Sequence, residues 1–115
     1  TALGKAILSH LPASYVDDIV DAYGLPDRQE NTIIDRSALT AELARVRDRN
    51  YAVEDEERRA GIRSVAVPIV VDEEVVGALS VSGPKERLDD ARIQNELLPA
   101  LRSRVNVVEV KFTYE

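Results

Sequence analysis

Two alternating, valine-rich segments joined by three acidic residues constrain the fold of this chain more than any other feature. Residues Ile62–Val71 and Val75–Gly83 alternate, and Asp72, Glu73 and Glu74 lie between them. Period-two alternation puts successive side chains on opposite faces of a sheet, and a short polar link between two such segments is typical of an antiparallel hairpin. The sequence therefore predicts a hairpin with one apolar face in the core.

The two faces of this hairpin follow from its register. If Val71 lies opposite Val75, one face carries small and hydroxyl-bearing side chains at its open end, with further residues nearer the turn: Ser64, Ala66, Ser80 and Ser82, then Pro68, Val70, Val76 and Ala78. The other face carries the bulky aliphatic residues Val65, Val67, Ile69, Leu79 and Val81. A face of serine and alanine leaves room above it for closely packed backbone or for a small polar molecule. The alternative is that these serines lie on an edge strand and form hydrogen bonds with water or with backbone groups.

Helical periodicity surrounds the hairpin. We expect helices over residues 2–10, from Ala13 or Ser14 to Tyr23, and over about 36–49. We also expect an extended segment at 32–34, a short strand over 51–54 and a further helix from Leu88. The second helix has its expected inward stripe at Tyr15 or Val16, Ile19, Val20 and Tyr23, with Gly24 ending it. Asp35 or Ser37 is a candidate N-cap of the third helix, and Asn50 is its candidate left-handed C-cap.

Two patterns compete near the C-terminus. Val108, Val110, Phe112 and Tyr114 alternate as in a strand. A helical stripe also runs through Leu98, Leu101, Val105, Val108 and Phe112. These patterns leave both a strand and a helix open for the C-terminal stretch. Together, the expected elements predict one α/β domain of the α+β class.

Composition excludes several classes of function. The 115 residues suffice for one domain, and 21 acidic against 15 basic residues give a net charge of −6, which disfavours nucleic-acid binding by this chain. The chain has no cysteine and one histidine, and we see no membrane span or secretory signal. It begins at Thr1 within an apolar segment, which we interpret as a processed or truncated piece of a longer protein.

No residue pattern indicates catalysis. A Gly-x-Ser-x-Gly motif is absent, and His10 has no evident link to the serines. The acidic run Glu54–Glu57 lacks the spacing of a calcium loop and is more typical of a solvated surface. We therefore expect a protein that is not an enzyme, with no catalytic residue, no metal site and no cofactor.

Four segments in order resemble the C-terminal effector-binding domain of the IclR family of bacterial and archaeal transcription regulators. They are ALGKAIL at 2–8, LTAELARVRDRNYAV at 39–53, Glu57 with GIRSVAVPI at 61–69, and ALSVSGP at 78–84. The resemblance implies a GAF-like fold, which is a curved antiparallel sheet flanked by helices with an effector pocket on its concave face. It favours a helix for the C-terminal stretch.

The resemblance also assigns a pocket. It implies binding residues at the equivalents of Ala2, Leu3, Gly4, Glu54, Ser64, Ser80 and Ser82, and the hairpin register adds Ala66 to the same face. Position 64 is commonly cysteine in the family and is serine here, whereas position 54 is commonly aspartate and is glutamate here. The longer Glu54 side chain narrows the expected pocket. Asn50 replaces the usual glycine.

The implied function is regulatory. We expect residues 1–115 to be an incomplete effector-binding domain, without its first strand and helix and without the winged helix-turn-helix domain that precedes it in the family. Such a domain senses a small organic acid, forms a homodimer or homotetramer in the cytoplasm, and contacts DNA only through the missing domain, with no membrane involved. The alternative is an oligomerisation or interaction module with no functional pocket.

Overall fold

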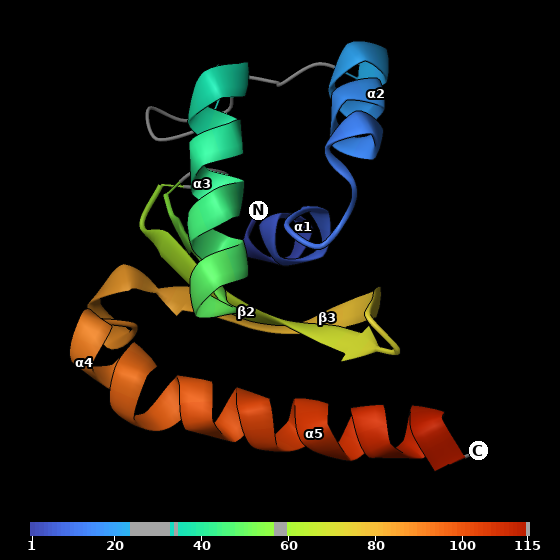
Figure 1. Ribbon diagram of the computed structural model, residues 1–115. Helices are drawn as coiled ribbons and strands as arrows, with labels where there is room; N and C mark the ends of the chain where they lie inside the picture. The colour runs from blue at the N-terminus through green and yellow to red at the C-terminus, as the bar shows by residue number, and fades with distance from the viewer. Residues whose placement is uncertain (24–32, 34, 57–59, 115) are drawn as a thin grey trace.

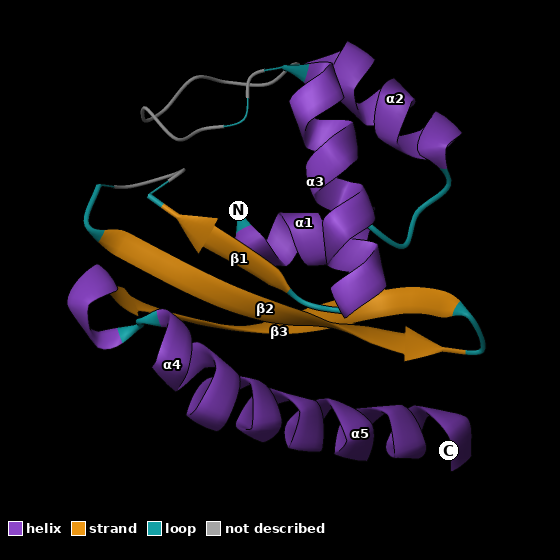
Figure 2. Ribbon diagram, turned by 60° about the vertical axis from the view of Figure 1, so that its left-hand side comes forward, coloured by secondary structure: helices purple, strands orange, loops and turns teal. Residues whose placement is uncertain are grey.

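The computed structural model describes residues 1–23, 33, 35–56 and 60–114 (Figure 1). Its elements are α1 (Ala2–Leu8), α2 (Ala13–Tyr23), α3 (Arg36–Arg49), β1 (Ala52–Asp55), β2 (Ile62–Val71), β3 (Glu74–Pro84), the 3₁₀ turn η1 (Lys85–Arg87), α4 (Asp90–Arg92), the π-helical turn η2 (Ile93–Leu97) and α5 (Leu98–Tyr114). The described strands form one antiparallel sheet in the order β1-β2-β3. Helices α1 to α3 lie on one side of this sheet and α5 runs along the other (Figure 2). The predicted α+β architecture, a curved antiparallel sheet flanked by helices, is confirmed.

The predicted hairpin register is confirmed at its open end and wrong at its turn. Ser64 pairs with Ser82, and Ala66 with Ser80, as expected. Near the turn, however, Val71 pairs with Glu74 rather than with Val75. The difference arises because the hairpin closes through a two-residue turn, and a β-bulge beside Val70 absorbs the extra residue.

The turn itself has an unusual backbone. Asp72 and Glu73 have φ values of 51° and 67°, the geometry of a turn that matches the twist of the two strands. At the bulge, the Val70 N–H donates a hydrogen bond of 2.8 Å to the Glu109 carboxylate on α5. The helix therefore satisfies a backbone group at the place where the ladder is irregular.

Two apolar clusters hold the layers together. The bulky hairpin face packs against the last helix: Val65, Val67, Ile69, Ile93, Leu98, Leu101 and Val105 are buried there. Small side chains let α1 approach the other face closely: Ala2, Ala6, Ala52 and Ala66 are buried with Val46. The size difference between the two faces therefore fixes which helix lies on which side.

The C-terminal stretch is a helix, as the resemblance implied. Its stripe is buried at Leu98, Leu101 and Val105, and Val108 packs at the margin of the cluster. Phe112 is exposed, so the stripe extends one position less than expected. The helix expected from Leu88 begins later, at Asp90, because the Asp89 side chain caps it by accepting the Arg92 N–H at 2.8 Å.

Two further expectations concern α2 and α3. The stripe expected on α2 is wrong at Ile19, which is exposed; of the alternatives Tyr15 and Val16, Tyr15 is exposed and Val16 is half-buried. In α3 both caps are confirmed: the Asp35 carboxylate accepts the Ser37 N–H at 2.8 Å, and Asn50 has φ 62° and ψ 34°.

Some expectations fall outside the described residues. These are the ending of α2 at Gly24, most of the extended segment at 32–34, and the Glu57 end of the acidic run. No helix in the described part of the chain is long and apolar enough to cross a membrane.

Candidate functional site

A cavity of about 400 Å³ lies between the start of α1 and the open end of the hairpin. We call it the serine cavity, and it is lined by Thr1, Ala2, Leu3, Glu54, Ile62, Ser64, Ser80, Ser82 and Gly83. Its volume is in the range of sites that hold small molecules. Six of the eight residues expected at the site are therefore brought together here.

A pair of serines forms the floor of the cavity. Ser64 Oγ and Ser82 Oγ are 2.7 Å apart across the β2–β3 pair, where either hydroxyl can donate. Ser64 is buried, whereas Ser80 and Ser82 on β3 are exposed. Because one hydroxyl hydrogen serves the pair, the donating group of the other serine remains available to a ligand.

Glu54 supplies a buried acid beside these hydroxyls. It lies opposite Ser64 on the neighbouring strand β1, and only 3% of its surface is exposed. Strand alternation turns its side chain toward α1, together with that of Ala52. The cavity therefore presents a carboxylate next to hydroxyl groups, a combination suited to a ligand that both donates and accepts hydrogen bonds.

The start of α1 closes one side of the cavity. Thr1 caps this helix, since its hydroxyl accepts the Gly4 N–H at 3.1 Å. That N–H is therefore engaged, and Gly4 does not line the cavity. Ala66 does not line it either, because α1 packs directly on this residue and leaves it 0% exposed.

Three lining residues were not among those expected: Thr1, Ile62 and Gly83. Ile62 has the same strand parity as Ser64, so the register carried a signal for it. Thr1 directly precedes a predicted helix, which is the position of an N-cap. Nothing in the alternation pattern marked Gly83.

The described residues show no metal-binding cluster. Among them, no group of three or more His, Asp or Glu side chains could hold a metal ion. His10, which follows the C-terminal end of α1, forms a hydrogen bond of 3.2 Å with the Asn50 side chain.

Comparison with known proteins places the chain in a family. The family model described as "Bacterial transcriptional regulator IclR C-terminal" matches residues 1–109. The chain belongs to the IclR family. It is 37% identical over 112 residues to the probable HTH-type transcriptional regulator ArcR of Halobacterium salinarum, covering 96% of this chain and 43% of that protein.

Solved structures of IclR-type domains agree. The C-terminal domain of the Escherichia coli transcriptional regulator KdgR has a TM-score of 0.88 and 30% identity, covering 96% of this chain and 67% of that one. A double mutant of the PobR inducer-binding domain from Acinetobacter, in complex with 3-hydroxybenzoic acid, has a TM-score of 0.89 and 27% identity, covering 95% and 63%.

These IclR relatives are transcriptional regulators and repressors, not enzymes. This chain is accordingly a regulatory effector-binding domain of the IclR type. It spans less than half the length of the curated relatives that it matches.

Proposed function

We propose that this domain senses a small organic acid in the serine cavity and thereby controls DNA binding by a helix-turn-helix domain of the whole protein. Because the curated relatives are more than twice as long, we also propose that residues 1–115 are part of the effector-binding domain of a longer cytoplasmic regulator. The observation that carries the proposal is the convergence of Glu54, Ser64 and Ser82 in one cavity.

The cavity chemistry suits an acid that also bears a hydroxyl group. A ligand carboxylate would accept hydrogen bonds from the Ser80 and Ser82 hydroxyls on the exposed side. Buried Glu54 disfavours a second carboxylate beside it but can accept a further hydrogen bond from a ligand donor, because a carboxylate has about four acceptor sites. A hydroxyl group on the ligand supplies such a donor, and 3-hydroxybenzoic acid, held by the similar PobR domain, has both groups.

Signalling requires that the ligand favours one state of the protein. A ligand in this cavity would touch both α1 and the hairpin, so it would bind best when these elements are held at one separation. Any such difference in affinity shifts a conformational or oligomeric equilibrium without chemistry. The helix-turn-helix domain would then respond to that shift.

Ligand binding is the first prediction. In a thermal-shift panel of small carboxylates that includes 3-hydroxybenzoate, we expect at least one acid to raise the melting temperature. A ligand concentration of about 100 times Kd should add about 2.7 kcal/mol to the free energy of unfolding. The Ser80→Ala, Ser82→Ala double variant should bind about thirtyfold more weakly, since each lost hydroxyl removes about 1 kcal/mol.

The control is Ser103→Ala, which removes an exposed hydroxyl on α5 far from the cavity. It should leave the affinity unchanged. An absence of any shift across the panel, or equal affinity of the double variant and the parent, contradicts the proposal.

A second function, self-association, is favoured by exposed apolar side chains on α5. Val107, Val110 and Phe112 are 51%, 56% and 59% exposed. Val107 and Val110 are three residues apart and lie on the helix face away from the sheet. This surface suits a homodimer or homotetramer, either with the ligand function or as an interaction module without it.

Self-association is the second prediction. Sedimentation velocity should show concentration-dependent association that Val110→Lys weakens about tenfold or more, because it places a charge in a desolvated contact. Val76→Lys, at an exposed valine on β3, is the matched control. A parent chain that stays monomeric at high concentration rules out this role for the chain.

A further inference from the structure

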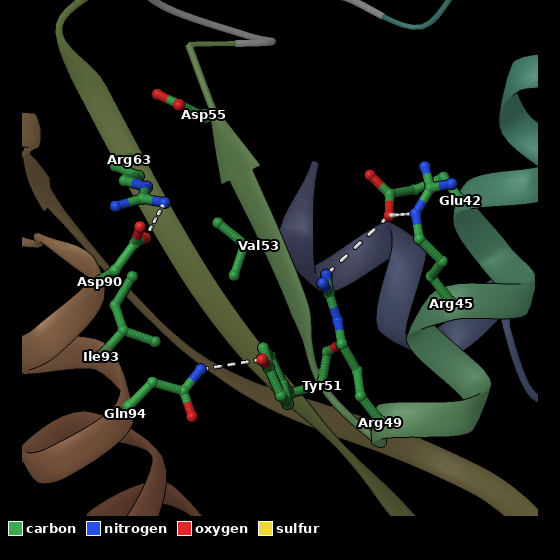
Figure 3. Close-up of a pocket in the computed structure, with 10 residues that line it drawn as sticks. All are labelled: Glu42, Arg45, Arg49, Tyr51, Val53, Asp55, Arg63, Asp90, Ile93 and Gln94. Carbon is green, nitrogen blue, oxygen red and sulfur yellow. Dashed lines mark hydrogen bonds and ion pairs between the residues drawn. The ribbon is translucent and has the colours of Figure 1, made fainter.

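A second cavity, of about 710 Å³, lies at the β1 edge of the sheet. It involves Tyr51, Val53 and Asp55, whose side chains alternate with that of Glu54. Because successive strand residues face opposite sides, this cavity lies on the other face of β1 from the serine cavity. Figure 3 shows it between two walls, with Val53 in the middle. We call it the arginine cavity.

The α3 wall carries a surplus of positive charge. Three cations converge on the Glu42 carboxylate: Lys5 Nζ at 3.2 Å, Arg45 Nε at 3.5 Å and an Arg49 nitrogen at 3.9 Å. Of the α3 residues that line the cavity, two arginines face one glutamate, which is an excess of one positive charge in a chain whose net charge is −6. Arg45 and Arg49 are 62% and 33% exposed, so a ligand can reach them.

The other two acids that line this cavity, Asp55 and Asp90, each form an ion pair. Asp90 lies 2.6 Å from an Arg63 nitrogen, and Asp55 lies 3.1 Å from Lys85 Nζ. The hydrogen bond from Lys85 to Asp55, the charge of that carboxylate and the charge of Glu56, which lies 3.8 Å from the same Nζ, raise the pKa of Lys85. Both of these acids are therefore engaged by cations that are not on α3.

The edge of β1 is closed to another strand. Lys5 Nζ donates to the Val53 carbonyl at 2.7 Å, and Arg49 Nε donates to the Tyr51 carbonyl at 2.9 Å. A peptide adding to this edge needs those carbonyls as acceptors. The cavity is accordingly suited to a small molecule and not to an added strand.

The rim is organised around an aromatic ring. The guanidinium carbons of Arg49 and Arg102 lie 4.5 Å and 5.7 Å from the centre of the Tyr51 ring. Gln94 Nε2 donates to the Tyr51 hydroxyl at 2.8 Å, as Figure 3 shows. Held in this way, and with its Nε bound to the Tyr51 carbonyl, Arg49 presents its remaining guanidinium N–H groups at a fixed orientation, and arginine binds oxyanions through such a planar group.

We propose that the arginine cavity is a second ligand site, for a carboxylate or phosphate group carried on a small apolar body. The oxyanion would accept hydrogen bonds from Arg45 and Arg49, and the apolar body would lie over Val53. The site would be filled independently of the serine cavity because the two face opposite sides of β1. The domain would then respond to two anions rather than one.

The test is a ¹⁵N NMR titration of the chain with three probes that share a phenyl group: phenylacetate, phenyl phosphate and neutral phenylacetamide. At least one of the two anions should shift the amide signals of Tyr51, Val53 and Gln94, whereas phenylacetamide should not shift them. Arg45→Gln should weaken this binding about tenfold, as expected for a charged hydrogen bond. Arg49→Lys should weaken it too, because lysine keeps the charge and loses the fork.

Arg104→Gln is the matched control, since it removes the same charge from an exposed position on α5. It should leave the affinity unchanged. Because Arg45 is largely exposed, its replacement should leave the fold intact, which the spectrum itself reports. Three results overturn the proposal: no shift at these amides with either anion, an equal shift with phenylacetamide, or the same affinity for Arg45→Gln as for the parent chain.

Discussion

Replacing Leu98 by alanine is expected to lower the free energy of unfolding by about 2–5 kcal/mol, the range for leucine removed from a packed core. Leu98 is 1% exposed and lies where α5 begins, in the cluster that packs this helix on the bulky hairpin face. Truncation loses the transfer free energy of the side chain and leaves a void that the two rigid layers cannot close. Urea unfolding followed by circular dichroism measures the loss.

The matched control is Leu3→Ala. Leu3 is 40% exposed on α1, so the same truncation there should cost less than about 1 kcal/mol. Equal losses for the two variants would mean that α5 is not docked on the sheet as described. A loss confined to Leu98→Ala supports the assignment of the C-terminal stretch to a packed helix.

That stretch shows where local pattern stops being decisive. Its alternation and its helical stripe are both present in the sequence, and only the existence of a bulky sheet face for the stripe to cover selects the helix. Glu109 adds a contact that no period encodes, because its partner is the N–H of Val70 at a bulge. The bulge accompanies the two-residue turn. Placing Val71 opposite Val75 assumes a three-residue link, so the sequence predicted no bulge.

The serine cavity was more predictable than the arginine cavity for a physical reason. Strand parity alone places Ser64 and Ser82 on one face, since the hairpin is a local structure of short sequence separation. Strand parity does not give the position of α1, which packs on Ala66 and leaves Ser64, Ser80 and Ser82 lining the cavity.

The arginine cavity combines α3, β1, β2 and the region after β3, which meet only in the folded chain. Its arginines are interspersed with acids along the sequence, so the sequence shows no segment with an excess of positive charge there. In the fold, Arg63 and Lys85 engage Asp90 and Asp55, whereas Arg45 and Arg49 share the single acid Glu42. No motif of fixed spacing could have shown this arrangement.

Lys5 is the clearest case of a residue whose role depends on tertiary structure. Helical periodicity marks it as one polar position in an apolar segment, and lysine is rarely buried. In the fold it is 4% exposed and joins three elements, because its Nζ on α1 contacts Glu42 on α3 and the Val53 carbonyl on β1.

Lys5→Met is therefore expected to lower the free energy of unfolding by about 3 kcal/mol, the scale for removing one partner of a buried ion pair. Methionine keeps most of the apolar stem, so the loss reports the ammonium group. Chemical denaturation measures it, and Lys111→Met, at an exposed position on α5, should change stability by less than about 0.5 kcal/mol.

A double-mutant cycle with Glu42→Gln measures how much of the Lys5→Met loss comes from the ion pair with Glu42. If the ion pair dominates, the two substitutions should be strongly coupled, because the loss of the Lys5 ammonium group matters less once the Glu42 charge is gone. If the Val53 carbonyl dominates, the two losses should add, and the uncapped edge of β1 should make Lys5→Met more prone to self-association. Equal stability of Lys5→Met and the parent chain would contradict both, since it would mean that neither contact holds α1 to the edge of the sheet.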